Sequence, residues 1–198
     1  HETRGAEDSR GLARAAARVL ARGGRFAPAF RQIEEFGLWQ DGPTVSDVFT
    51  ALATSGPDAE LLRRAYPLPE ADPAPALDAG ARQALAARLI ALGFGARAEA
   101  LLATSPTPDA PAVRLLMGAA ALAREAPDET LRAIAGLSGP EATRLRAEAH
   151  LALGAPESAA PHIAALPDTA NRADLAWRAG NWALLAETGT EAQKALAT

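Results

Sequence analysis

Hydrophobic positions recur along most of the chain with the period of an α-helix, in segments that Gly and Pro interrupt at short intervals. Ala, Leu, Arg and Glu, which favour helices, fill these segments. Val, Ile, Thr and aromatic residues are sparse and do not alternate with polar ones, so the pattern predicts an all-α protein. The expected helix pairs are 9–22 with 26–37, 44–54 with 57–66, 78–92 with 95–104, 110–124 with 127–136, 140–153 with 156–165, and 169–179 with 181–188, followed by a turn at 190–196.

Start and stop signals support several of these bounds. Ser9 precedes the first expected helix, and Pro127 and Pro156 stand at first helical positions, where the missing N–H of proline is tolerated. A helix often ends at a Gly in the left-handed conformation, and the sequence places a Gly at four expected helix ends. These residues are Gly24, Gly93, Gly154 and Gly180.

The stretch from Pro67 to Pro75 has four Pro in nine residues, which excludes a helix there. It is interpreted either as a semi-rigid linker or as a surface loop within one array. The linker interpretation divides the chain into an N-terminal helical part at 1–66, a Pro-rich segment at 67–77 and a C-terminal array at 78–198.

Several helix pairs follow one rule of spacing. A small residue lies seven positions before the turn, and an Ala usually lies five positions after it. The turn positions 93, 125, 154 and 180 are spaced by 32, 29 and 26 residues. Two helices in each period of about 30 residues predict an array of helical repeats.

This arrangement resembles the tetratricopeptide repeat family over most of the chain, although the pair at 44–54 and 57–66 does not follow the rule. In that family a small residue of the first helix lets the second helix approach, and an Ala of the second helix fills the crossing. The resemblance implies an all-α, right-handed superhelix of about five to six antiparallel helix pairs. The matching positions are Ala17, Ala86, Gly118, Ala147 and Ala173 in first helices, and Ala29, Ala98 and Ala159, with the larger Ile33, Leu102, Ile134 and Ile163, in second helices.

The resemblance also implies a concave groove that binds a partner peptide or helix. Its expected lining residues are Arg14, Arg18, Gln83, Ile90, Leu115, Leu122, Arg144, Glu148, Leu151, Asp174 and Trp177. An alternative is that the apolar members belong to the core and that Trp177 and Trp182 bury the end of the array, since periodic apolar residues are usually buried. Trp39 is expected to pack between the first two pairs.

Composition narrows the class of protein. Ala makes up 52 of the 198 residues, so the predicted core is shallow. The absence of Cys excludes disulfides, thiolate nucleophiles and Cys-ligated metals. No apolar run is long enough to span a membrane, so a soluble module is expected, in either the cytoplasm or the periplasm.

Charge is distributed unevenly about a net value of −4. Six Arg and no acidic residue occur between Ser9 and Ile33, whereas the rest of the chain is acidic. Arg residues recur every four positions on the first helix, on a face expected to lie opposite Leu12, Ala16 and Val19. This face is interpreted either as a solvated outer surface or as a docking strip for an acidic partner or an anionic lipid surface. Nucleic acid is not expected, because no aromatic residues are interleaved with the Arg.

Candidate catalytic chemistry is sparse. The chain has three His, of which His150 and His162 are expected to face each other across one hairpin. Without a carboxylate at fixed spacing, two His make a poor metal site. No phosphate-binding loop, dinucleotide-binding fingerprint or nucleophile elbow occurs. No enzymatic activity, metal or cofactor is therefore expected.

The sequence predicts a non-catalytic protein–protein interaction module, an adaptor or an assembly scaffold. Two alternatives stay open: an accessory or regulatory domain of a larger protein, and a periplasmic helper associated with the cell envelope. A catalytic domain would require a cluster of polar side chains in a deep pocket.

Overall fold

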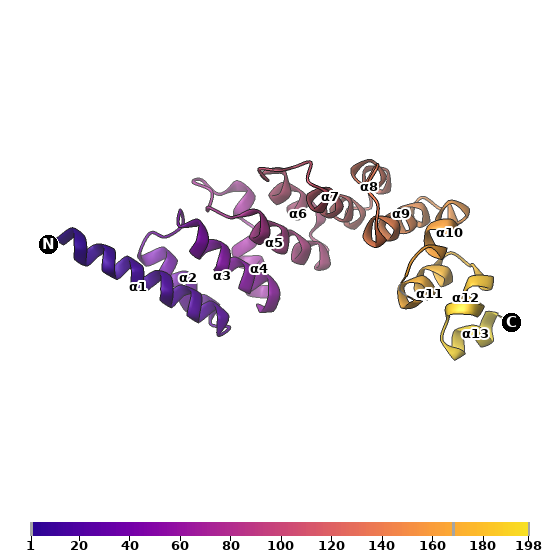
Figure 1. Cartoon of the computed structure of the whole chain (residues 1–198), viewed down its shortest axis with the longest axis horizontal. Helices are drawn as coiled ribbons and strands as arrows, with labels where there is room; N and C mark the ends of the chain where they lie inside the picture. Colours follow the sequence, from indigo (N-terminus) through magenta and orange to yellow (C-terminus); the bar gives the residue numbers. More distant parts are fainter. Residues whose placement is uncertain (1, 168, 198) are drawn as a thin grey trace. The chain divides into compact units, whose positions relative to one another are not determined.

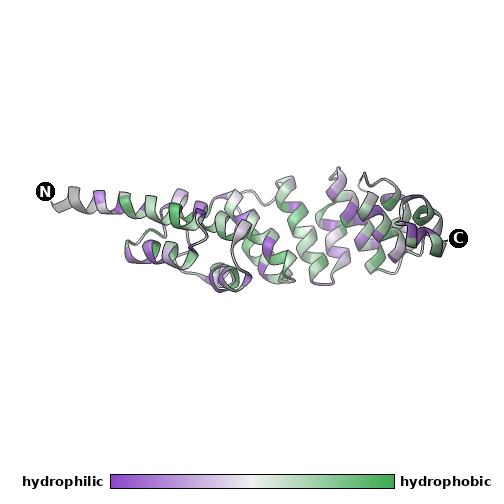
Figure 2. Cartoon of the chain, turned by 90° about the horizontal axis from the view of Figure 1, so that it is seen from below, coloured by the Kyte–Doolittle hydropathy of each residue, from purple (hydrophilic) through white to green (hydrophobic). Residues whose placement is uncertain are grey.

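The structure, a computed structural model, describes residues 2–167 and 169–197, without the side chains of residues 2–6, 169 and 197. Within these ranges the chain forms thirteen α-helices and one 3₁₀-helix, with no β-strand (Figure 1). The helices carry apolar and polar residues on different parts of their surfaces, as amphipathic helices do (Figure 2). The prediction of an all-α protein is confirmed.

The chain divides into two compact units, His1–Pro108 and Asp109–Thr198. The first unit contains α1 (Glu2–Arg22), α2 (Phe26–Glu35), α3 (Gly42–Ser55), α4 (Asp58–Ala65), the 3₁₀-helix η1 (Leu68–Glu70), α5 (Ala79–Ala91) and α6 (Gly95–Ala103). The second contains α7 (Pro111–Ala123), α8 (Pro127–Ala133), α9 (Pro140–Ala152), α10 (Pro156–Ala164), α11 (Thr169–Arg178), α12 (Trp182–Thr188) and α13 (Glu191–Ala197).

The start of the first helix differs from the prediction. Ser9 is not a helix start, because α1 already begins at Glu2 and continues through Gly5. Acidic residues near a helix N-terminus are favourable, and the surrounding Ala and Arg are strong helix formers. A single Gly costs too little to end a helix in such a context. The expected first-turn prolines, in contrast, are confirmed in α8 and α10.

The left-handed turns lie where the spacing rule places them. The backbone angle φ is positive at all five turn positions: 72° at Gly24, 84° at Gly93, 61° at Glu125, 69° at Gly154 and 64° at Gly180. In each case the N–H of the next residue donates to the carbonyl four positions before the turn residue, as from Phe94 to Leu89 over 2.8 Å. This is the hydrogen bond of a Schellman motif, which closes the end of the first helix.

The small and large positions of the repeat form the buried core. Every Ala of the first-helix and second-helix sets is buried, and so are the four large residues of the second helices. The helix pair α7–α8 has Gly118 and Thr130 in place of two Ala. There the Thr130 hydroxyl donates to the Gly118 carbonyl over 3.0 Å, so the extra polar atom has a buried partner.

Within each unit, the first helices of successive pairs pack in chain order. In the first unit α1 packs against α3 and α3 against α5, while in the second α7 packs against α9 and α9 touches α11 only slightly. The first helix also packs against the second helix of its own pair, except that α4 touches α3 only slightly. This exception falls on the pair that does not follow the spacing rule.

The Pro-rich segment lies inside the first unit and is hydrogen-bonded to it. The N–H of Ala76 donates to the Trp39 carbonyl over 3.0 Å, and the Gln40 side chain donates to the Ala74 carbonyl over 3.0 Å. The N–H of Asp78 donates to the Ser46 hydroxyl over 2.8 Å. These bonds hold the segment as a surface loop, whereas the two compact units meet in sequence at 108/109.

Candidate partner-binding surfaces

The arginines of α1 bind groups of the protein's own chain. The Arg14 Nε lies 2.6 Å from Asp41 Oδ2, and the Arg18 Nε lies 3.1 Å from Asp47 Oδ2. The Arg10 Nε donates to the Phe36 carbonyl over 3.3 Å. Three of the regularly spaced arginines therefore attach α1 to the segments that follow it.

Asp41 also caps α3. Its carboxylate accepts from the N–H of Thr44 over 3.2 Å, which satisfies one of the free donors at the helix start. Burial opposes ionisation of Asp41, but hydrogen bonds from Thr44 and Arg14 outweigh it, so its pKa lies below the ordinary value. Arg14 thus helps to hold the start of α3.

The apolar face of α1 does not lie where the helical pattern suggests. The buried face consists of Ala13, Ala17 and Ala21, whereas Leu12 is 74% exposed and Val19 is 68% exposed. The Arg14 and Arg18 side chains are ion-paired but still 42% and 34% exposed, so both interpretations of the Arg face, as a solvated surface and as a docking strip, stay predictions. Alanine allows the close helix contact on this side, and the larger apolar residues remain uncovered.

The expected groove residues divide between the two units. Arg14 and Arg18 on α1 and Gln83 and Ile90 on α5 belong to the first unit. The other seven lie on three helices of the second unit that pack in order: Leu115 and Leu122 on α7, Arg144, Glu148 and Leu151 on α9, and Asp174 and Trp177 on α11. Gln83, Ile90, Leu115, Leu122 and Leu151 are all half-buried, so the apolar members are neither fully core nor fully exposed.

Arg144 is held between two carboxylates of its own helix. Its guanidinium lies 2.6 Å from Glu141 Oε1 and also binds Glu148. The hydrogen bond from Arg144 lowers the pKa of Glu141, and that of Arg144 rises above its ordinary value for the same reason. Arg144 is therefore occupied by carboxylates of its own helix.

Trp177 and Trp182 pack against each other but are not buried. Their rings are 5.6 Å apart in an edge-to-face arrangement, and they are 42% and 49% exposed. The alternative in which these two residues bury the end of the array is therefore wrong. Nearby, Leu151 packs at the margin of a buried cluster that includes Ile163, Leu175 and Leu185. Accessible apolar surface thus adjoins a firmly packed core.

The first unit contains a pocket that the sequence did not predict. The pocket has a volume of about 470 Å³ and is lined by Trp39, Arg63, Arg64, Pro67, Leu68, Ala71, Asp72, Pro73 and Pro75. The Trp39 ring stacks on Phe30 of α2 at 6.2 Å, and Phe30 meets Phe49 of α3 at 5.0 Å. Trp39 therefore packs against the first pair, and its expected place between the first two pairs stays a prediction. The only sequence signal for the pocket is the Pro-rich segment.

The cations at this pocket already have partners. The Arg64 guanidinium lies 4.5 Å from the Phe30 ring centre and binds Glu34 and Glu60. Arg63 binds Glu60 as well. An anion entering the pocket would therefore compete with carboxylates of the protein.

The histidine pair lies as expected. The rings of His150 on α9 and His162 on α10 are parallel and 5.7 Å apart. Burial lowers the pKa of His162, and electrostatic interactions with His150 and Arg146 lower it further. Among the side chains that the structure describes, no group of three or more His, Cys, Asp or Glu is placed to hold a metal ion.

Comparisons with known proteins give no match for this chain. No protein-family model matches the chain, and neither a curated protein nor a solved structure matches it. The resemblance to tetratricopeptide repeats therefore stays a prediction from the sequence pattern. None of the helices in the described part of the chain is both long and apolar enough to cross a membrane.

Proposed function

We propose that the protein is a non-catalytic interaction module whose helix pairs form a right-handed, tetratricopeptide-like solenoid. A partner peptide or helix binds the second unit on the surface formed by α7, α9 and α11. The observation that supports this proposal is a row of partly or fully exposed apolar residues at equivalent places on these three helices.

The row consists of Leu122, Leu151 and Trp177. Each lies three residues before its left-handed turn residue, at 125, 154 and 180 respectively. Because the turns close their helices with the same hydrogen bond, equal spacing places the three side chains at the same height and on the same face of their helices. Since α7 packs against α9 and α9 touches α11, the row runs over three successive first helices.

The charges beside this row favour a basic partner. Glu148 and Asp174 each lie six residues before their turn residue, on the same side as the apolar row. Arg144 is already shared by two carboxylates. Residues 109–198 contain eleven acidic and eight basic residues, a net charge of −3. A peptide with two or three apolar side chains flanked by Lys or Arg fits this chemistry.

The surface on the second unit therefore favours a different partner from the Arg face of α1, because the Arg face would favour an acidic partner. Arg14 and Arg18 are bound to Asp41 and Asp47, so an acidic partner would have to displace carboxylates that are already in place. Such an exchange gains little free energy. The surface on the second unit requires no such exchange for its apolar row.

A peptide library selected against the intact protein tests the proposal. Selected peptides are expected to combine apolar and basic residues, and their affinity should fall about tenfold or more in Trp177→Ala, which removes a large exposed contact. Leu196→Ala is the matched control, since Leu196 is 69% exposed but lies on α13. Peptides with an acidic consensus, or peptides that bind Trp177→Ala and the parent equally well, would contradict the proposal.

A further inference from the structure

The outer face of α1, which carries Leu12 and Val19, has apolar residues at the positions where later first helices are covered by another helix. In the repeat register, Val19 lies five residues and Leu12 twelve residues before the turn at Gly24. Most of the equivalent residues on later first helices are buried, namely Ala81 on α5, Ala142 and Ala149 on α9, and Leu175 on α11, whereas Arg88 on α5 is half-buried and ion-paired with Asp58.

Those later helices differ from α1 in one respect. Each of α5 and α9 packs against the first helix of the preceding pair, and α11 touches that helix slightly, whereas α1 is the first helix of the described chain. The largest apolar side chains on this face are thus the uncovered ones, Leu12 and Val19. Burying a Leu or Val side chain stabilises a contact through the hydrophobic effect. A helix laid along α1 would therefore bind here.

The pattern of this face is symmetric along the helix. Leu12 and Val19 are equally distant from the midpoint between Ala15, which is exposed, and Ala16, which is half-buried. Two copies of α1 packed antiparallel about that midpoint place Leu12 of one copy level with Val19 of the other, at both ends of the contact. The Ala residues at the centre permit a close approach. A two-fold interface requires such a self-complementary surface.

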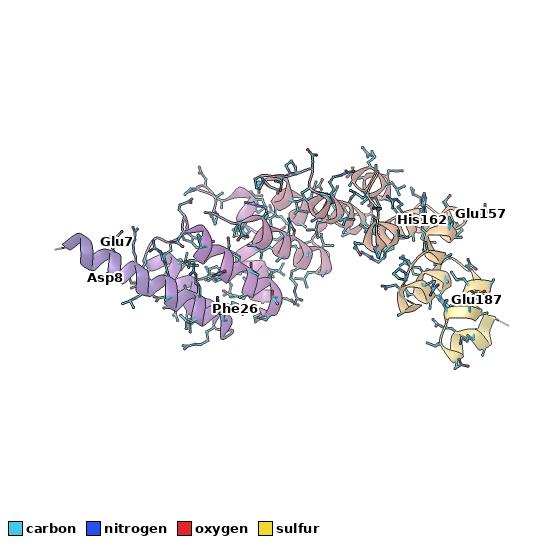
Figure 3. The ribbon with its side chains drawn as sticks, viewed as in Figure 1. Glu7, Asp8, Phe26, Glu157, His162 and Glu187 are labelled. Atoms are coloured by element: carbon cyan, nitrogen blue, oxygen red, sulfur yellow. The ribbon has the colours of Figure 1, made fainter. Side chains whose placement is uncertain are left out.

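The charges at the ends of α1 select the same arrangement. Glu7 and Asp8 are exposed near its start, on the part that extends past α2 (Figure 3), and Arg22 and Arg25 are exposed at its end. In an antiparallel pair the acidic start of one copy lies beside the basic end of the other. A parallel pair would instead bring like charges together at both ends.

We propose that this chain self-associates through the outer face of α1, as an antiparallel, two-fold α1–α1 contact between two copies. The contact is separate from the surface proposed on the second unit. Two copies of this single helix bury less than the 1,200–2,000 Å² of a typical stable interface, so the dimer forms in a concentration-dependent way.

Sedimentation velocity over a wide range of protein concentration tests the contact. The parent chain is expected to rise from a species of 20.4 kDa towards twice that mass. Leu12→Glu combined with Val19→Glu should weaken association at least about tenfold, because it places four carboxylates in the contact. Leu196→Glu, which changes an equally exposed Leu on α13, should associate like the parent. Circular dichroism checks that all variants keep their helix content.

Charge reversal tests the antiparallel direction. One variant carries Glu7→Arg and Asp8→Arg, and a second carries Arg22→Glu and Arg25→Glu. Each alone should associate more weakly than the parent, because both ends of its dimer would then oppose like charges. An equimolar mixture of the two should recover association, and added salt should weaken it.

Three outcomes would overturn the proposal. A parent chain that is monomeric at every concentration would leave this face to some other helix. A parental dimer that the Leu12 and Val19 substitutions leave unchanged would have its interface elsewhere. A mixture of the charge variants that associates no better than either one alone would exclude the antiparallel contact.

Discussion

The hairpins α7–α8 and α9–α10 reach the same backbone geometry with different residues. Each first helix begins at a Pro, and each turn closes with the same hydrogen bond, from Ala126 to Ala121 over 3.0 Å and from Ala155 to His150 over 2.9 Å. The turn residue is Glu125 in one hairpin and Gly154 in the other, at φ angles of 61° and 69°. The turn is therefore set by the packing of the two helices as well as by the residue in it.

The two hairpins fill the space at the helix crossing with different residues. Ala147 and Ala159 fill it in α9–α10, whereas Gly118 and Thr130 fill it in α7–α8. A Cβ added at Gly118 would lie only 2.7 Å from Cγ2 of the buried Ile134. The larger Thr130 is accommodated opposite a residue without a side chain, and its hydroxyl uses the nearby carbonyl. The comparison shows that side chains of the two helices together fill one limited volume at the crossing. The larger of the two side chains can then come from only one helix.

Among the substitutions that test this comparison, Ala159→Thr should have the largest effect on the free energy of unfolding. It introduces the larger residue of α7–α8 into a crossing where Ala147 still has its methyl group. Overpacking should lower the free energy of unfolding by about 2 kcal/mol. Urea unfolding followed by circular dichroism measures it. Ala160→Thr is the control, because Ala160, the next residue of α10, is only half-buried; equal losses in both variants would show that position 159 is not special.

Gly154→Ala should have the next largest effect. An Ala at a φ of 69° is strained, which should cost about 1 kcal/mol of stability. Gly11→Ala is a matched control within a helix, where a Cβ meets nothing within 4 Å, so that variant should gain about 0.5–1 kcal/mol. The comparison fails if both substitutions change the urea midpoint in the same direction.

Glu125→Gly should have the smallest effect, and of opposite sign. It relieves the left-handed strain of a non-Gly residue, about 1 kcal/mol, while Gly adds nearly as much entropy to the unfolded chain. A net gain of up to about 0.5 kcal/mol is expected in the same urea experiment. A clear loss would mean that the Glu125 side chain itself stabilises the turn.

Much of the hairpin geometry could be predicted from sequence because it depends on local chemistry. A Gly at a helix end indicates a left-handed turn, and small residues at fixed spacing from it indicate a close crossing, as at Ala98 and Ala159. Even the turn at Glu125 follows from the repeat, although nothing in a lone Glu suggests positive φ. The early start of α1 at Glu2 was missed because Ser9 is a typical helix cap.

The candidate site was less predictable because it depends on contacts between distant segments. Only the fold places the Asp41 and Asp47 carboxylates beside the arginines of α1, and only the fold shows that Ala13, Ala17 and Ala21 form its covered face. Helical periodicity alone favours burial of Leu12 and Val19, which the structure leaves exposed. The boundary between the two units at 108/109 lies in a short loop that resembles the other connections.

The central claim is that residues at fixed distances from a left-handed turn share one packed crossing. A double-mutant cycle between Gly118 and Ile134 tests it most directly. Gly118→Ala should lower the free energy of unfolding by about 1 kcal/mol, since overpacking against Cγ2 of Ile134 outweighs the better helix propensity of Ala. Combined with Ile134→Leu, which removes that methyl group, the cost should largely disappear, giving a coupling energy of about 1 kcal/mol by urea unfolding. Additive effects of the two substitutions would contradict the account.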